Sequence, residues 1–186
     1  GDTMTLWFVS HKEDGTLTCD SSYPDCYKGD SLTVCWGNPG TPPLTGTTPA
    51  LEVSVYYDRI PSEIFTTPPT FTGVEIARTT LDPYSDRASA TQFDTAIVNN
   101  CTIDGVTYPF QKTIAFSTMG GTGVENTGLI FAKIRMIYNT DESHLIGFSV
   151  PLGSLPLQGL DITSTGTSVV DGSTQESVSY RKIQMF

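Results

Sequence analysis

The chain has 186 residues, of which 38% are hydrophobic and 16% are charged. This length fits one domain with a sizeable core, and the low charged fraction argues against a long-helix protein, which needs many charged residues on its wet faces. The formal net charge of -10 argues against partners with a phosphate backbone and against anionic membrane surfaces. No run approaches the roughly 18 apolar residues of a membrane helix.

The first third of the chain contains short runs in which apolar and polar residues alternate. Alternation with a period of two is typical of a half-buried β-strand. It predicts strands over residues 4–9, 31–36 and 51–57. The last run is the clearest, because every second residue from Leu51 to Tyr57 is apolar or aromatic.

The middle of the chain mixes element types. Residues 81–89 are expected to hold one short helix, and residues 92–98 fit either a strand or a single helical turn. Asp104-Gly105 is a strong turn signal. It precedes a run that predicts a strand over residues 106–116.

The clearest hairpin signal lies between residues 129 and 150. From 129 to 138 the apolar set Ile130, Ala132, Ile134, Met136 and Tyr138 points to one side, and charged residues point to the other. A polar turn follows over residues 139–143, and the alternation resumes over residues 146–150. Two alternating runs joined by a short polar turn predict a β-hairpin. Residues 177–186 are expected to form a terminal strand.

Segments rich in Gly, Pro, Ser and Thr separate these runs, over residues 37–43, 66–69, 119–123 and 163–172. Such segments are typical of connections. Many short strands separated by turn clusters predict an all-β fold, an antiparallel β-sandwich of jelly-roll or knob-like type with long loops. No composition shift marks a boundary, so we expect one domain over residues 1–186.

Signatures of catalysis are lacking. The sequence has no phosphate-binding loop, dinucleotide fingerprint or nucleophile elbow. We therefore predict no catalytic residue and no cofactor. His11 and His144 both adjoin polar sequence and are interpreted as exposed surface residues. The acidic N-terminal region around Asp14 is interpreted as a solvated loop, and we predict no metal site there or elsewhere.

The four cysteines leave alternatives open. Cys19, Cys26, Cys35 and Cys101 are spaced too far apart for a usual zinc site. A loop disulfide joining Cys19 to Cys26, or Cys26 to Cys35, is one interpretation, and buried free thiols are another. Asn100 begins an N-glycosylation sequon whose middle residue is Cys101.

A binding role fits the loops better than a catalytic one does. Tyr23, Tyr27 and Tyr84 lie in predicted loops beside Pro, Asp, Ser or Gly. Tyrosine on a loop offers a rigid, amphipathic contact surface at low entropic cost. These three residues are our candidates for contact with a receptor, and covering the ends of the sandwich is the alternative role for each ring.

The N-terminal stretch from Gly1 to Trp7 resembles the junction between shaft and head in adenovirus fibres, which carries a Thr-Leu-Trp element; here it is Thr5-Leu6-Trp7. The resemblance implies a trimeric antiparallel sandwich that binds a host-cell protein or a sialylated glycan. It also implies assembly in the nucleus, with reduced thiols and no glycan on Asn100. An astrovirus-type capsid spike, which is dimeric, is a second viral possibility.

The sequence thus predicts a viral attachment domain at the virion surface, not an enzyme. It is expected to bind a host-cell receptor as a homo-oligomer, a trimer before a dimer, without nucleic-acid binding or membrane insertion. Two alternatives remain. One is a secreted carbohydrate-binding or adhesive β-sandwich, which oxidised cysteines would favour, and the other is a hydrolase on a jelly-roll scaffold.

Overall fold

The structure is a computed structural model that describes residues 3–12, 14–19, 26–60, 70–121, 124, 128–140, 142–158, 160–168 and 177–185. By its internal contacts the chain divides into two compact units, Gly1–Pro156 and Leu157–Phe186. The second unit is an antiparallel pair of strands, β12 (Leu160–Ser168) and β13 (Ser177–Met185).

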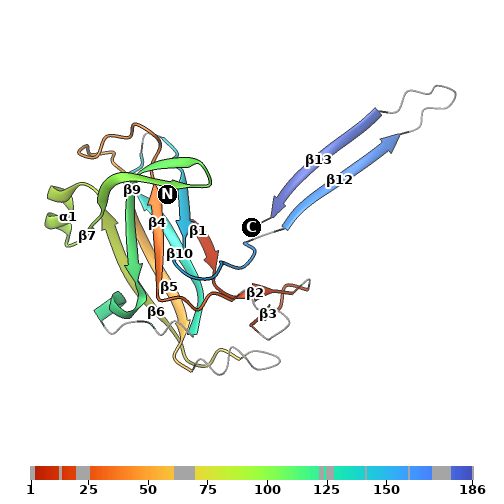
Figure 1. Cartoon of the computed structure of the whole chain (residues 1–186), viewed down its shortest axis with the longest axis horizontal. Coiled ribbons are helices and arrows are strands. Elements are labelled where there is room, and N and C mark those ends of the chain that lie inside the picture. Colours follow the sequence, from red (N-terminus) through yellow and green to blue (C-terminus); the bar gives the residue numbers. More distant parts are fainter. Residues whose placement is uncertain are drawn as a thin grey trace. The chain divides into compact units, whose positions relative to one another are not determined.

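Two sheets form the first unit (Figure 1). The larger sheet has the order β1-β10-β5-β6-β7. Its neighbours pair antiparallel, except that β6 and β7 are parallel. The strand bounds are β1 Thr3–Trp7, β10 Leu129–Ile137, β5 Ala50–Asp58, β6 Val74–Asp82 and β7 Asp94–Thr95.

The smaller sheet has the order β11-β4-β9-β8 and is antiparallel throughout. Its strands are β11 Ile146–Ser149, β4 Ser31–Trp36, β9 Val106–Ala115 and β8 Ile97–Ile103. A short hairpin of β2 (Ser10–His11) and β3 (Leu17–Thr18), the helix α1 (Ser85–Thr91) and the 3-10 segment η2 (Phe116–Gly121) complete the unit.

The core lies between the two sheets. The alternation along each strand sends one set of side chains inward, where apolar surface leaves water. Trp36 is fully buried, and its indole Nε1 donates to the carbonyl oxygen of Pro49 at 2.8 Å. The main hydrophobic cluster of the core contains buried side chains from both sheets. They include Leu6, Val53, Val55 and Ala132 from the larger sheet and Leu32, Val34, Trp36 and Phe110 from the smaller one.

The all-β, sandwich-like fold confirms the class predicted from the sequence. The strands expected over residues 4–9, 31–36, 51–57, 106–116 and 177–186 and the short helix are present within a few residues. Asp104 and Gly105 have φ values of 49° and 80°. Positive φ at both central residues is what a tight I′ hairpin turn requires, and it joins β8 to β9.

The hairpin predicted over residues 129–150 is wrong. Strand β10 lies between β1 and β5 in the larger sheet, whereas β11 pairs with β4 in the smaller one. The connection crosses between the sheets and is tied to Asn38, whose side chain donates to the carbonyl of Ser143 and accepts from the backbone N–H of Leu145. Alternation indicates that a segment is a strand, but it does not identify the neighbouring strand in the sheet. The hairpin was mispredicted for this reason.

Two further differences have simple causes. Strand β6 was not predicted, because the exposed apolar residues Val74 and Ile76 weaken the contrast between its two faces. Residues 163–168 belong to β12 and not to a connection. Threonine is β-branched and suits an extended backbone, so a run of Ser and Thr does not exclude a strand.

All four cysteines are paired. Cys19 is joined to Cys26, and Cys35 is joined to Cys101. The first pair was one of the two predicted loop disulfides. Cys26–Cys35 and buried free thiols are both wrong, as are the reduced thiols that a nuclear assembly implies. The second bond links β4 to β8 across the intervening β9, two strands that do not pair directly.

We predict that the two disulfides contribute unequally to stability. Cys35–Cys101 joins residues 66 apart and Cys19–Cys26 joins residues 7 apart. In the chain-entropy account the long loop is worth about 4 kcal/mol and the short one about 2 kcal/mol. Guanidinium unfolding should therefore show a larger loss for Cys35→Ala/Cys101→Ala than for Cys19→Ala/Cys26→Ala. The reverse order would show that native packing, not loop closure, controls these bonds.

Candidate binding surface on the larger sheet

The three tyrosines predicted to contact a receptor have different surroundings. Tyr23 lies outside the described residues. Tyr27 is only 2% exposed, and its ring packs against Phe8 and Phe116 while its hydroxyl donates to the carbonyl of Ser31. This burial removes Tyr27 from the residues that can contact a partner in the folded protein. Its neighbours in sequence are polar, but its ring belongs to the core.

Tyr84 is half-buried and belongs to a cluster centred on Arg87 of α1. Its ring lies 5.5 Å from the guanidinium carbon, and the ring of Tyr138 lies 3.9 Å from it. The guanidinium also forms a two-pronged contact with the fully buried carboxylate of Asp82, at 2.7 and 2.9 Å. It donates further to the carbonyl of Thr48 at 2.7 Å. These contacts give Tyr84 a structural role.

We predict that Arg87→Met destabilises the fold by about 3–5 kcal/mol, because the buried carboxylate of Asp82 loses the cation that compensates its charge. Arg59→Met is the matched control. Its pair with Glu75 spans 3.1 Å, but both side chains are largely exposed, so about 0–1 kcal/mol is expected. Chemical unfolding of the two variants measures both values, and equal losses would contradict the account.

The side of the larger sheet that points away from the core carries rows of partly exposed side chains. We call this side the outer face. Cross-strand partners share a side of a sheet, so the register defines rows of neighbours. Three rows cross β1, β10, β5 and β6 in that order. They are Trp7, Phe131, Tyr56 and Ile76; Thr5, Lys133, Ser54 and Arg78; and Thr3, Arg135, Glu52 and Thr80.

The first row is a continuous apolar and aromatic strip. The rings of Tyr56 and Phe131 are stacked, with centroids 4.3 Å apart and planes 18° apart. Trp7 packs against Phe131 at 5.1 Å, and His11 places its ring edge-on to Trp7 at 4.4 Å. Ile76 ends the strip and is 44% exposed. Rings that pack against each other in this way are restricted in their rotamers, so the strip is a rigid contact surface.

A small apolar cluster supports one end of this strip. Val9 and Ile130 are buried there, and Trp7 and Phe131 pack against them. The disulfide Cys19–Cys26 and Leu17 belong to the same cluster, so the β2–β3 hairpin holds the Trp7 end in place. Burial lowers the pKa of the His11 imidazole from its ordinary value, which favours the neutral ring beside Trp7.

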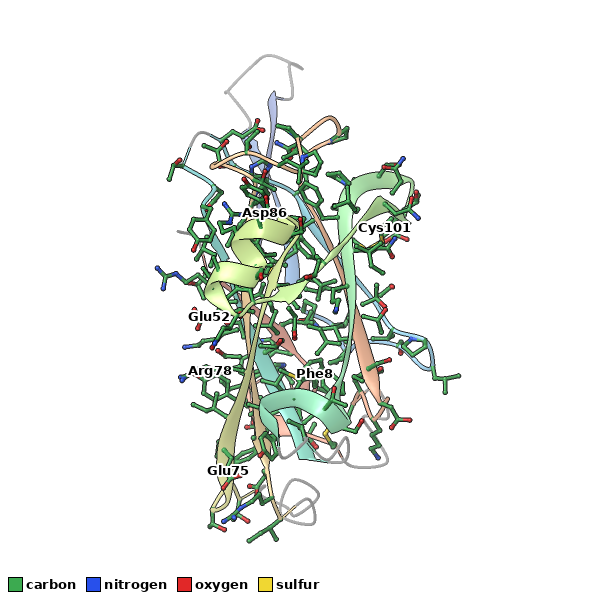
Figure 2. All side chains as sticks on the ribbon, turned by 90° about the vertical axis from the view of Figure 1, so that its left-hand side faces the viewer. Phe8, Glu52, Glu75, Arg78, Asp86 and Cys101 are labelled. Carbon is green, nitrogen blue, oxygen red and sulfur yellow. A yellow bond between two sulfur atoms is a disulfide. The ribbon has the colours of Figure 1, made fainter. Side chains whose placement is uncertain are left out.

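The next two rows collect positive charge. Lys133, Arg78 and Arg135 are exposed, and Glu52 is the one carboxylate among the twelve positions. Three of the ten Lys and Arg residues of a chain with a net charge of -10 thus lie together. Figure 2 shows Arg78 and Glu52 on the outward side of the sheet, whereas Phe8 points between the sheets.

The aromatic row and the cationic rows lie next to each other. The ammonium nitrogen of Lys133 lies 5.9 Å from the ring centroid of Tyr56, within reach of a cation–π contact. Ser54 is short and lies between Lys133 and Arg78 in the middle row. The outer face therefore offers rings for stacking directly beside cations that can receive an anionic group.

Part of the outer face could have been recognised from the sequence. Phe131, Lys133 and Arg135 occupy the polar side of a strand that the alternation predicted, and Tyr56 lies on the polar side of another. An aromatic residue on a solvent side, followed by two cations, was a usable hint. It could not show that Phe131 and Tyr56 are neighbours, because strand order and register are tertiary facts.

The histidines differ from their predicted surroundings. His144 was interpreted as exposed, but its side chain is 1% exposed, and His11 is half-buried against Trp7. Within the described ranges no group of three or more acidic, histidine or cysteine side chains is arranged to hold a metal ion. The described part of the chain also has no helix with the length and apolar character needed to cross a membrane.

Comparison with models of protein families, with curated proteins and with solved structures finds no match to this chain.

Proposed function

We propose that the chain is a non-enzymatic binding domain that works outside the cytosol and holds an acidic glycan on the outer face. The observation that carries the proposal is the adjacency of the aromatic row to the cationic rows. The C–H faces of a sugar ring stack on aromatic rings, and a carboxylate or sulfate on the sugar pairs with Lys and Arg. Both contacts are available here within one sheet.

Charge supports a glycan over a nucleic acid. Aromatic rings beside cations on a sheet also suit single-stranded nucleic acid, which stacks its bases on such rings. A chain with a net charge of -10 repels a continuous phosphate backbone at long range. A glycan that carries charge on only some of its sugars has fewer charges per length than a nucleic acid, so three local cations can hold it against that repulsion.

The paired cysteines support an extracellular setting. Disulfides form and persist in oxidising compartments and are rare in the cytosol and nucleus. Both cysteine pairs therefore favour a secreted or cell-surface route. Among the settings that the sequence leaves open, this favours a secreted carbohydrate-binding module over a fibre head assembled in the nucleus.

Attachment at a virion surface is the second proposed setting, and it uses the same face on a host glycan. The resemblance of Thr5-Leu6-Trp7 to the junction between shaft and head in adenovirus fibres is what supports it. Light scattering after size exclusion separates the settings, because the chain mass is 20.1 kDa. A trimer supports a fibre head, a dimer supports a capsid spike, and a monomer supports the secreted module.

We predict that Lys133→Ala/Arg78→Ala weakens binding to alginate, a polymer of carboxylated sugars, at least tenfold, since each lost charge-assisted hydrogen bond is worth about 1.5–3 kcal/mol. Tyr56→Ala should weaken it through lost stacking. Lys112→Ala is the control, because Lys112 lies on β9 of the smaller sheet and its ammonium donates to the carbonyl of Thr95.

Isothermal titration in low and moderate salt provides the readout. The double variant should also lose part of the salt dependence, since fewer charges are neutralised on binding. Neutral dextran serves as the uncharged polymer. If wild-type protein binds alginate no better than dextran, or if Lys112→Ala weakens binding as much as the double variant, the outer face is not an acidic-glycan site.

A further inference from the structure

A modification motif lies on strand β8, in the smaller sheet. Asn100, Cys101 and Thr102 form an N-glycosylation sequon, and no other Asn of the chain is followed two residues later by Ser or Thr. Asn100 and Thr102 are both exposed. Cys101 between them is half-buried and is bonded to the fully buried Cys35. The two residues that define the motif are therefore accessible, while the residue between them anchors the strand.

The pairing of β8 with β9 is irregular at the sequon. Between Val98 and Cys101, β8 has one residue more than the segment of β9 opposite, which makes a β-bulge. The β9 residue in this interval is Pro109, which has no N–H to donate, and a proline within a sheet is typically found at such a bulge or at an edge. Asn100 has no partner in the register of β8 and β9. A bulky group on its side chain therefore replaces no cross-strand contact.

Strand β8 is also a free edge of its sheet. Among the described strands it pairs with β9 alone, at the end of the order β11-β4-β9-β8. A free edge offers unpaired N–H and C=O groups to another chain, and proteins protect such edges with Lys, Pro or a cover. Residues 97–103 contain no Pro and no charged residue, and Ile97 and Val98 are 54% and 50% exposed. The bulge interrupts this edge but leaves its apolar side chains uncovered.

We propose that Asn100 carries an N-linked glycan, and that this glycan covers the edge of β8 and keeps it from pairing with a second chain. In the transfer, the amide nitrogen of Asn100 forms a bond to C1 of an oligosaccharide. The bond from C1 to the pyrophosphate of a lipid carrier breaks, and the lipid pyrophosphate leaves with the amide proton. The lipid-linked oligosaccharide is the co-substrate, and it is supplied in the secretory route that the two disulfides favour.

The position of Asn100 suits this cover. It is the central residue of β8, and a strand of seven residues is about 20 Å long, so either end lies about 10 Å away. An oligosaccharide of several sugars reaches that far, and it is bulky and solubilising. The attachment point belongs to the smaller sheet, whereas the outer face belongs to the larger one. The inference thus rests on the secretory setting in the proposed function, and not on what the outer face binds.

The first experiment tests the attachment. The chain is secreted from eukaryotic cells, and its intact mass is measured before and after peptide N-glycosidase, which removes the glycan and converts its asparagine to aspartate. We expect the wild type to lose the mass of one glycan, with the new aspartate at position 100 in peptide mapping. Thr102→Ala should carry no glycan, and Thr102→Ser, the matched control that keeps the motif, should carry it. A secreted wild-type chain without a glycan would overturn the inference.

The second experiment tests the cover by light scattering over a series of concentrations. The glycosylated wild type and Thr102→Ser should keep a constant mass, whereas Asn100→Gln and Thr102→Ala from the same cells should associate further as the concentration rises. Adding Ile97→Lys to Asn100→Gln should restore the constant mass, because a lysine on an edge strand opposes pairing. A constant mass of both unglycosylated variants, or an association that Ile97→Lys leaves unchanged, would overturn the covering role.

Binding to alginate separates this inference from the proposed function. Asn100→Gln should bind alginate as the wild type does, because its site lies on the other sheet. A wild-type chain that carries the glycan but binds no alginate would overturn only the acidic-glycan function. A wild-type chain that binds alginate but leaves the secretory cells unmodified would overturn only this inference.

Discussion

The register of β10 between β1 and β5 is the constraint on which the outer face depends. Strand β10 pairs Leu129 with Tyr57, but then pairs Phe131 with Tyr56, so the register shifts by one residue at this point. Without the shift, Phe131 would oppose Val55, whose side chain is in the core. A shift by one residue exchanges the two sides of a strand. The irregularity therefore places Phe131 outward and keeps Ala132, Ile134 and Met136 inward.

The same irregularity connects the surface to the interior. Ile130, the residue at the shift, is buried with Val9 in the small cluster beneath Trp7. The disulfide Cys19–Cys26 closes that cluster from the β2–β3 hairpin. The aromatic row is thus rigid because its rings stack on each other and its Trp7 end rests on buried side chains. Rigid surfaces lose little conformational entropy on binding, which favours affinity.

Charge distribution, not net charge, decides what this surface can hold. The chain as a whole is acidic, and that alone suggests no anionic partner. Folding brings Arg78 of β6 into the row of Lys133, with Arg135 two residues further along β10. The opposite pattern occurs in the interior, where Asp82 is neutralised by Arg87 with the rings of Tyr84 and Tyr138 alongside. In that second cluster the charges of Asp82 and Arg87 compensate each other, so they stabilise the fold and do not serve a ligand.

The class of fold could be predicted from the sequence, because alternation indicates which residues leave water, and that needs no knowledge of the partner strand. The sequence also located the turn at Asp104-Gly105, where the backbone demands positive φ. The strand order could not be predicted from the sequence, nor could the pairing of β11 with β4 in the other sheet or the bond between Cys35 and Cys101. The tertiary structure likewise buried Tyr27 and His144, whose polar neighbours in sequence predicted exposure. The physical reason is the same in each case: periodicity is a local property of the chain, whereas pairing, register and burial arise from contacts between residues far apart in it.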